Sequence, residues 1–418
     1  MKIFLIVIAL LVGYTAVAQN LMPGKPEQAG ISSERLGRID NLVQEYLSTQ
    51  QIPGAVVLIA RQGKIVYQKA YGFSDADTKT PMKTDHIFRI ASQTKAITSL
   101  AVMMLWEEGK FLLDEPVSKY IPELKNPRVL VNFNESDSSY STEPAKSEPT
   151  IRQLLTHTSG IDYAAIGSRE MKGIYAKAGV PSGIGNNTGK LADKIKLLAQ
   201  LPLKHHPGER YTYGLNTDVL GYLVEIWSGM SLDEFFQKRI FLPLGMKDTY
   251  FYLPKEKYSR LVTLCETQNG KAVTVKGKIY DQVDPNYPAT AGTYYSGGAG
   301  LSGTIEDYAR FLQLFLNGGT YNGTRLLSRK TVELMLTNQV QPPLTTQFGL
   351  GFGLETASND YLSVYSVGSF SWGGAFSTQY WADPKEKLVA LIYTNMYNAP
   401  LRSLGDKFKI ATYQAIVD

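Results

Sequence analysis

The stretch that decides the fold is Phe88-Arg89-Ile90-Ala91-Ser92-Gln93-Thr94-Lys95-Ala96-Ile97-Thr98-Ser99-Leu100. It predicts the end of a strand or loop that runs into a helix, which continues to about Gly109. Ser92 and Lys95 are three residues apart, so they share one face of that helix. A Lys amine that burial has deprotonated can take the proton of a Ser hydroxyl, and a helix N-terminus directs N–H groups toward a developing oxyanion. The spacing therefore allows a nucleophile that works without histidine.

By itself, Ser-x-x-Lys is a common pattern. The alternative is an ordinary amphipathic helix with a capping Ser and an exposed Lys, which are the usual places of these residue types. The rest of the chain has to decide between the two.

Length and composition describe an ordinary globular protein. The chain has 418 residues, of which 44% are hydrophobic and 19% charged, and this is enough for a large core in two lobes. The net charge of +5 includes Lys2, and no block of Lys and Arg occurs. We therefore expect no nucleic-acid partner. Nothing in the sequence specifies an oligomeric state.

The first residues predict export. Met1-Lys2 is followed by an apolar run from Ile3 to Val12 and by Ala16-Val17-Ala18, which is the pattern of a secretory signal peptide cleaved after Ala18. The apolar run is short for a membrane span, so we expect no stable span after cleavage and a periplasmic or secreted protein. The single cysteine, Cys265, excludes an internal disulfide.

The layout along the chain predicts an α+β fold. Strand-like segments occur near both ends, and mostly helical segments lie between them. We predict a signal peptide over residues 1–18 and one domain over 19–418. Within it, an antiparallel sheet flanked by helices should form from about 28–90 and 290–418, and a mostly helical lobe from about 91–289. Residues 132–149 are polar and read as an exposed loop-like insertion.

Two other kinds of catalytic site find little support. The four His residues show no metal-ligand spacing, and we expect neither a metal site nor a cofactor. No G-x-S-x-G elbow is present, and His157 lies in a helix-end turn where a structural hydrogen bond is the expected role.

Several motifs in register give the sequence a family resemblance from about Gln28 to the C-terminus. They are Phe88–Lys95, Leu154–Gly160, Pro207–Tyr213, Gly298–Ser302 with Asp307–Phe311, and Ser371–Gly374. Together they resemble the class C β-lactamase and penicillin-binding-protein-like serine hydrolases. The resemblance implies a β-lactamase/transpeptidase-like fold and favours the chemical interpretation of Ser92 and Lys95.

The resemblance also implies roles for individual residues. Ser92 is the expected nucleophile, Lys95 its activating neighbour and Tyr213 the acid/base partner. The backbone N–H groups of Ser92 and Ala375 are expected to form the oxyanion hole. Substrate-binding positions implied by the family motifs are Trp372, Gly373, Gly374, Leu215 and Asn216.

Two positions depart from the family pattern. Leu215 replaces the Asn that binds a substrate amide, and Asn216 follows one position later. Trp372 stands where the family has Lys or His, so it offers no charge to a substrate carboxylate. Both changes resemble the esterase branch. We therefore expect an exported serine hydrolase that cleaves small esters, and possible amides, through an acyl-serine.

Two alternatives stay open at this point. One is a β-lactamase, a D-alanyl-D-alanine carboxypeptidase or another D-amino-acid peptidase, which would use a β-lactam or a cell-wall peptide with the same chemistry. The other is an inactive relative that binds peptidoglycan fragments. The presence of Ser92, Lys95 and Tyr213 favours an enzyme over a binding protein.

Overall fold

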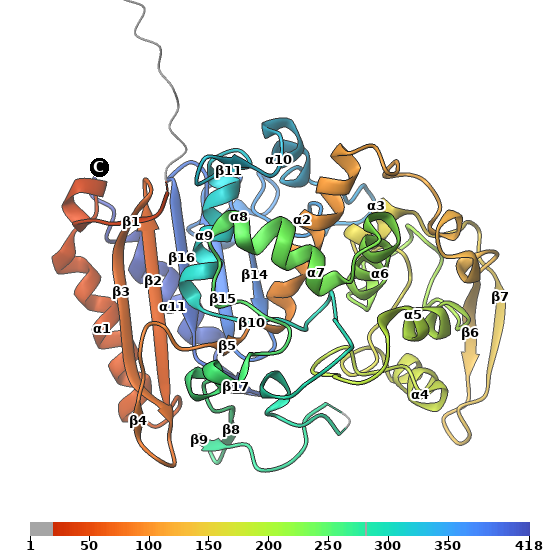
Figure 1. Ribbon diagram of the computed structural model, residues 1–418, viewed down its shortest axis with the longest axis horizontal. Coiled ribbons are helices and arrows are strands. Elements are labelled where there is room, and N and C mark those ends of the chain that lie inside the picture. The colour runs from red at the N-terminus through yellow and green to blue at the C-terminus, as the bar shows by residue number, and fades with distance from the viewer. Residues whose placement is uncertain (1–19, 281) are drawn as a thin grey trace, which may run out of the picture.

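The computed structural model describes residues 20–280 and 282–418, and its largest element is an eight-stranded sheet (Figure 1). All pairings in it are antiparallel except that between β1 and β3. The order across the sheet is β1 (Met22–Pro23), β3 (Lys64–Asp75), β2 (Gly54–Arg61), β16 (Leu388–Tyr393), β15 (Thr378–Asp383), β14 (Phe370–Gly374) and β13 (Gly353–Leu354), with β4 (Thr80–Pro81) paired to β3. The signal peptide predicted over residues 1–18 lies outside the described residues.

The two ends of the chain meet in the centre of this sheet. Strand β2 pairs with β16 in a register that places Leu58 opposite Leu391, and every residue of both strands is buried. Such uninterrupted apolar runs are typical of strands that are covered on both faces. This explains why neither segment shows the alternation of a half-exposed strand.

Helices cover the sheet on both faces. Helices α1 (Ser33–Ser48) and α11 (Arg402–Tyr413) pack on one face, in a core that contains Ile39 and Phe408. Helix α9 (Ile305–Leu316) packs on the other face and contributes Phe311 to the larger core. The structure thus confirms the predicted α+β class, an antiparallel sheet flanked by helices.

A largely helical region lies beside the sheet, with α2 (Thr94–Glu107) between the two (Figure 1). Helix α2 packs against α6 (Asn216–Ser228). The other helices of the region are α3 (Ile151–Leu155), α4 (Arg169–Ala178), α5 (Leu191–Ala199), α7 (Leu232–Phe236) and α8 (Leu242–Leu244). Almost all of α2 is buried, because it is covered by α6 on one side and by the sheet layer on the other.

The composition of residues 132–149 suggested a loop, but this polar insertion also contains strands. Its residues up to Pro144 belong to a hairpin of β6 (Arg128–Phe133) and β7 (Tyr140–Pro144). The strands are mostly exposed, so no apolar alternation marks them in the sequence. The remaining short strands pair in three small sheets: β5 (Phe88–Arg89) with β10 (Ser302–Gly303), β11 (Thr320–Tyr321) with β12 (Thr324–Arg325), and β8 (Cys265–Gln268) with β9 (Lys271–Thr274) and β17 (Met396–Tyr397). Helix α10 (Arg329–Met335) follows β12.

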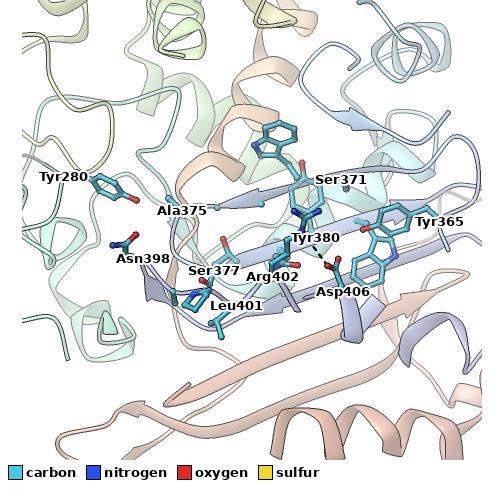
Figure 2. A pocket seen from close by; sticks show the side chains of 18 residues that line it. Tyr280, Tyr365, Ser371, Ala375, Ser377, Tyr380, Asn398, Leu401, Arg402 and Asp406 are labelled. Atoms are coloured by element: carbon cyan, nitrogen blue, oxygen red, sulfur yellow. Dashed lines mark ion pairs between the residues drawn. The ribbon is translucent and has the colours of Figure 1, made fainter. Parts of the chain in front are cut away.

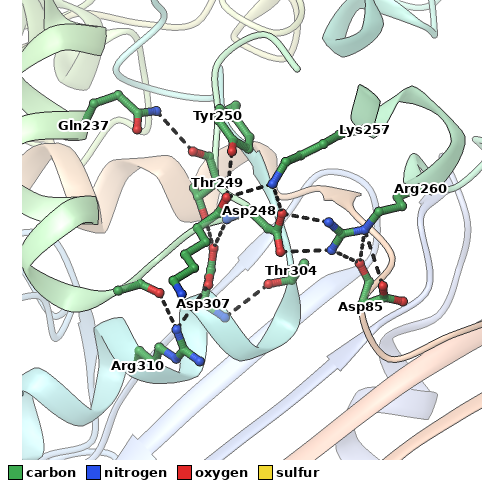
Figure 3. A network of polar contacts seen from close by, with 12 residues as sticks. Asp85, Gln237, Asp248, Thr249, Tyr250, Lys257, Arg260, Thr304, Asp307 and Arg310 are labelled. Atoms are coloured by element: carbon green, nitrogen blue, oxygen red, sulfur yellow. Dashed lines mark hydrogen bonds and ion pairs between the residues drawn. The ribbon is translucent and has the colours of Figure 1, made fainter. Parts of the chain in front are cut away.

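A polar network holds the N-terminus of α9 against the loop after α8 (Figure 3). The carboxylate of Asp307 accepts hydrogen bonds from the backbone N–H of Asp248 at 2.7 Å and from Thr249 Oγ1 at 2.9 Å. Asp248 in turn forms ion pairs with Lys257 and Arg260. The network therefore fixes α9, which supports the sheet that carries part of the candidate site. No helix within residues 20–280 and 282–418 is long and apolar enough to cross a membrane.

Candidate active site

Ser92 lies at the junction between the sheet layer and α2. It belongs to a short 3₁₀ turn, Ala91–Gln93, that leads directly into the helix. Ala91 has a φ of +42°, in the left-handed region that a residue with a Cβ adopts only at a cost of order 1–3 kcal/mol. Ser92 is 7% exposed. The serine is therefore held at a sharp turn rather than inside the regular helix that its spacing to Lys95 suggested.

Lys95, one residue into α2, nevertheless reaches Ser92. Its side chain is 4% exposed, and Nζ lies 3.3 Å from Ser92 Oγ. Nζ also donates to the carbonyl oxygen of Gly298 at 2.8 Å and to the hydroxyl of Tyr163 at 3.5 Å. The amine of Lys95 is thus surrounded by three fixed oxygen atoms, one of which belongs to Ser92.

Tyr213, on the loop that enters α6, faces the same amine. Its ring centroid lies 4.6 Å from Lys95 Nζ. Its hydroxyl accepts a hydrogen bond from Trp372 Nε1 at 3.4 Å, and it donates to no residue that the structure describes. The indole of Trp372 therefore reaches from β14 to Tyr213, and the Tyr213 proton is left available.

An aromatic cluster surrounds Tyr213 and Trp372. Phe348 packs edge-on against Trp372, and His157 packs against Tyr213. Burial holds the pKa of His157 well below its usual value, so this imidazole is neutral. The cluster is therefore aromatic, and its imidazole carries no charge.

Leu215 and Asn216 are buried in the turn before α6. The Asn216 side chain accepts from Ser159 Oγ and donates to His157 Nδ1 at 3.0 Å. Through these bonds the Asn216 amide stabilises the turn that carries Tyr213. The structure therefore does not bring Asn216 to Ser92, and it gives Leu215 a packing contact beside Gly183.

Strand β14 passes very close to the segment before Ser92. A Cβ atom on Gly374 would overlap the carbonyl oxygen of Ile90 and the hydroxyl of Thr378, so only glycine fits. Ala375 follows immediately, at the end of the strand. Because Gly374 lies against Ile90, the backbone of Ala375 lies near the Ser92 turn. This is the place that the predicted role of the Ala375 N–H in the oxyanion hole requires.

A groove of about 730 Å³ continues from this strand. Trp372, Gly373, Gly374 and Ala375 line it, together with residues of β15 and the start of α11. Figure 2 shows Ala375 and Tyr280 toward one end and Tyr365 and Asp406 at the other. The lining of this groove includes Trp372 and Ala375 but not Ser92, Lys95 or Tyr213.

Three residues of the site received no role from the sequence. Tyr163 and Gly298 contact Lys95 directly, and Asp218 lies beside them on α6. Burial raises the pKa of Tyr163 well above its usual value, so its hydroxyl stays protonated. A carboxylate inside the apolar run of α6 was the one signal that could have indicated Asp218. Among residues 20–280 and 282–418, no cluster of His, Cys, Asp and Glu could hold a metal ion.

Comparison with known proteins identifies the family. The Beta-lactamase family model matches residues 39–412. The chain belongs to the β-lactamase family. This confirms the resemblance seen in the motifs and the β-lactamase/transpeptidase-like fold. It also confirms that the protein is a hydrolase.

Individual relatives of the β-lactamase family match along almost the whole chain. Protein Rv1367c of Mycobacterium tuberculosis is 32% identical, over 90% of this chain and 97% of its own length. Esterase EstB of Burkholderia gladioli is 30% identical, over 86% of this chain and 90% of its own. Among solved structures, EstCE1, a hydrolase with promiscuous acyltransferase activity, superposes with a TM-score of 0.79 at 26% identity, over 91% of this chain and 99% of its own.

Proposed function

We propose that the protein is an exported serine hydrolase that cleaves small esters through an acyl-Ser92 intermediate. The observation that carries the proposal is the buried contact between Lys95 Nζ and Ser92 Oγ. A neutral amine has two N–H donors and one lone pair. The carbonyl of Gly298 and the hydroxyl of Tyr163 can accept from the two donors, which leaves the lone pair for the Ser92 proton.

The proposed reaction has two half-reactions. Ser92 Oγ attacks the ester carbonyl carbon while its proton passes to Lys95 Nζ, and the backbone N–H groups of Ser92 and Ala375 stabilise the oxyanion. Tyr213 gives its hydroxyl proton to the leaving alcohol oxygen as the C–O bond breaks, and regains a proton from Lys95. Water then attacks acyl-Ser92 by the reverse route and releases the carboxylic acid.

The aromatic cluster around Trp372 and Tyr213 favours an ester substrate that carries no carboxylate. Trp372 supplies neither a charge nor a second donor, because its only N–H is directed to the Tyr213 hydroxyl. A penicillin or a D-Ala-D-Ala peptide carries a carboxylate that needs a cationic partner. The similarity to EstB, an esterase, and to EstCE1, a hydrolase with acyltransferase activity, supports the same choice.

A substrate panel tests the proposal. We expect the protein to hydrolyse p-nitrophenyl acetate and butyrate, to leave a chromogenic cephalosporin and a D-Ala-D-Ala peptide almost untouched, and to lose ester hydrolysis in Ser92→Ala. Turnover of the cephalosporin or of the peptide in preference to the esters would establish the β-lactamase or peptidase alternative. No turnover and no labelling of Ser92 would indicate a binding protein.

Export is the second part of the proposal. It rests on Met1-Lys2, the apolar run that follows and the Ala-x-Ala sequence ending at Ala18. Expression of the full chain in a Gram-negative host, followed by N-terminal sequencing of the periplasmic protein, tests it. We expect Gln19 as the first residue, and a protein that keeps Met1 in the cytoplasmic fraction would refute it.

A further inference from the structure

A buried carboxylate lies next to the catalytic lysine. Asp218, on the first turn of α6, is 1% exposed. Its Oδ1 accepts a hydrogen bond from Ser296 Oγ at 2.7 Å, whereas Oδ2 is buried without a hydrogen-bond partner among the residues that the structure describes. An isolated buried carboxylate is costly unless a nearby positive charge or donor compensates it.

The backbone at Gly298 joins Asp218 and Lys95. Its carbonyl accepts from Lys95 Nζ, and a Cβ atom on this glycine would overlap Asp218 Oδ2 and lie 3.5 Å from Lys95 Nζ. The two side-chain atoms are therefore no more than about 6 Å apart, which is within the range where opposite charges influence each other's ionisation. A side chain at position 298 would clash with the Asp218 carboxylate, so glycine lets that carboxylate lie close to the backbone that binds Lys95.

We propose that Asp218 is a positioning residue whose carboxylate stabilises the positive charge that Lys95 acquires when it takes the Ser92 proton. The inference rests on the roles proposed above for Ser92 and Lys95. Proton transfer creates an ammonium ion in a buried site, where water cannot solvate it. A fixed negative charge beside Nζ compensates for that missing solvation, as preorganised charges do in other active sites.

The surroundings of Asp218 give this role a pH dependence. The titratable groups that face it are Lys95 from α2, Tyr163 from the loop after α3, and Tyr294 from the loop before Ser296. Burial raises the pKa of both tyrosines well above the usual value, so they stay neutral. Burial also raises the pKa of Asp218 to about 6, against the opposing effect of the Ser296 hydrogen bond. Below this pH the carboxyl is protonated and its charge is lost.

The test is the pH profile of kcat/KM for p-nitrophenyl acetate. In the wild-type protein we expect an acidic limb near pH 6. Asp218→Asn keeps an acceptor for Ser296 but carries no charge, so the limb should disappear, and kcat at pH 8 should fall by at least about 10-fold, because a charge at this distance is worth more than one tenfold step.

Asp307→Asn is the matched control. Asp307 is another buried aspartate whose pKa burial raises to about 6, but its partners are Thr249 and the Asp248 backbone, away from Lys95. We expect its profile to keep the limb. A limb that persists in Asp218→Asn, or vanishes equally in Asp307→Asn, would overturn the proposal while leaving the role of Ser92 intact. If instead wild-type turnover survives in Ser92→Ala, the proposed function itself fails.

Ser296→Ala provides a second test of the role of Asp218 if Asp218→Asn does not fold. This change removes the hydrogen bond that favours the ionised carboxylate. The acidic limb should therefore move to higher pH with Asp218 still present. An unchanged limb in a folded Ser296→Ala protein would contradict the proposal.

Discussion

Substituting Gly374 with alanine tests the packing that the proposed oxyanion hole needs. A Cβ atom there would lie about 1 Å closer to the Ile90 carbonyl oxygen than an ordinary van der Waals contact allows. Thr378 blocks the other side, and both neighbours are held by buried packing, so β14 has to move away from the Ser92 turn.

The size of the effect follows from this displacement. A misplacement of about 1 Å at a reacting centre lowers the rate by about 100-fold, or about 2.7 kcal/mol of transition-state stabilisation. We therefore expect kcat/KM of Gly374→Ala for p-nitrophenyl acetate to fall about 100-fold. Most of the fall should be in kcat, because the interaction lost is made in the transition state.

The assay needs a folded variant and a matched control. Circular dichroism and thermal melting report folding, and Gly37→Ala supplies the control because Gly37 lies in α1 and a Cβ there would meet nothing within 4 Å. The control should keep wild-type kinetics. If Gly374→Ala is folded and its kcat/KM is within about threefold of the wild type, the close approach of β14 has no part in catalysis.

Two further predictions concern Asp307 and Trp372. Burial raises the pKa of Asp307 from 3.8 to about 6, so the folded protein binds the Asp307 proton more tightly than the unfolded chain does. The stability that results is present at low pH and is lost as pH rises through about 6. Between pH 4 and 7, urea titrations should show the wild type losing about 2–3 kcal/mol more unfolding free energy than Asp307→Asn, and parallel curves would refute the assignment. Trp372→Ala removes the indole that contacts Tyr213, so kcat/KM for a bulky ester relative to the acetate should rise about tenfold. An unchanged ratio would show that the indole does not limit substrate size.

The sequence predicted those features that depend on local spacing and on apolar runs. Ser92 and Lys95 were expected to meet because they lie three positions apart, and the structure brings them together at 3.3 Å. Strand-like segments were predicted near both ends of the chain, and the apolar runs of β2 and β16 lie together in the centre of the sheet, where both faces are covered. Family membership was predicted because several motifs occur in order, which chance does not produce.

The features that escaped prediction depend on contacts between distant segments. Lys95 meets Gly298 only because the loop before β10 packs onto α2, and no local pattern encodes that distance. Asn216 was assigned to the substrate because of its place in the motif, whereas its partners His157 and Ser159 come from the turn after α3. The left-handed backbone of Ala91 is likewise imposed by the surrounding packing, since alanine itself disfavours it.

Acyl transfer to Ser92 tests the central claim most directly. The wild-type protein is mixed with excess p-nitrophenyl butyrate, quenched in acid within the first turnovers, and digested for peptide mapping by mass spectrometry. We predict a butyryl group on Ser92, in the peptide that contains Lys95, and none in Ser92→Ala. A butyryl group on another serine, or ester turnover by the wild type and by Ser92→Ala at equal rates, would contradict the account.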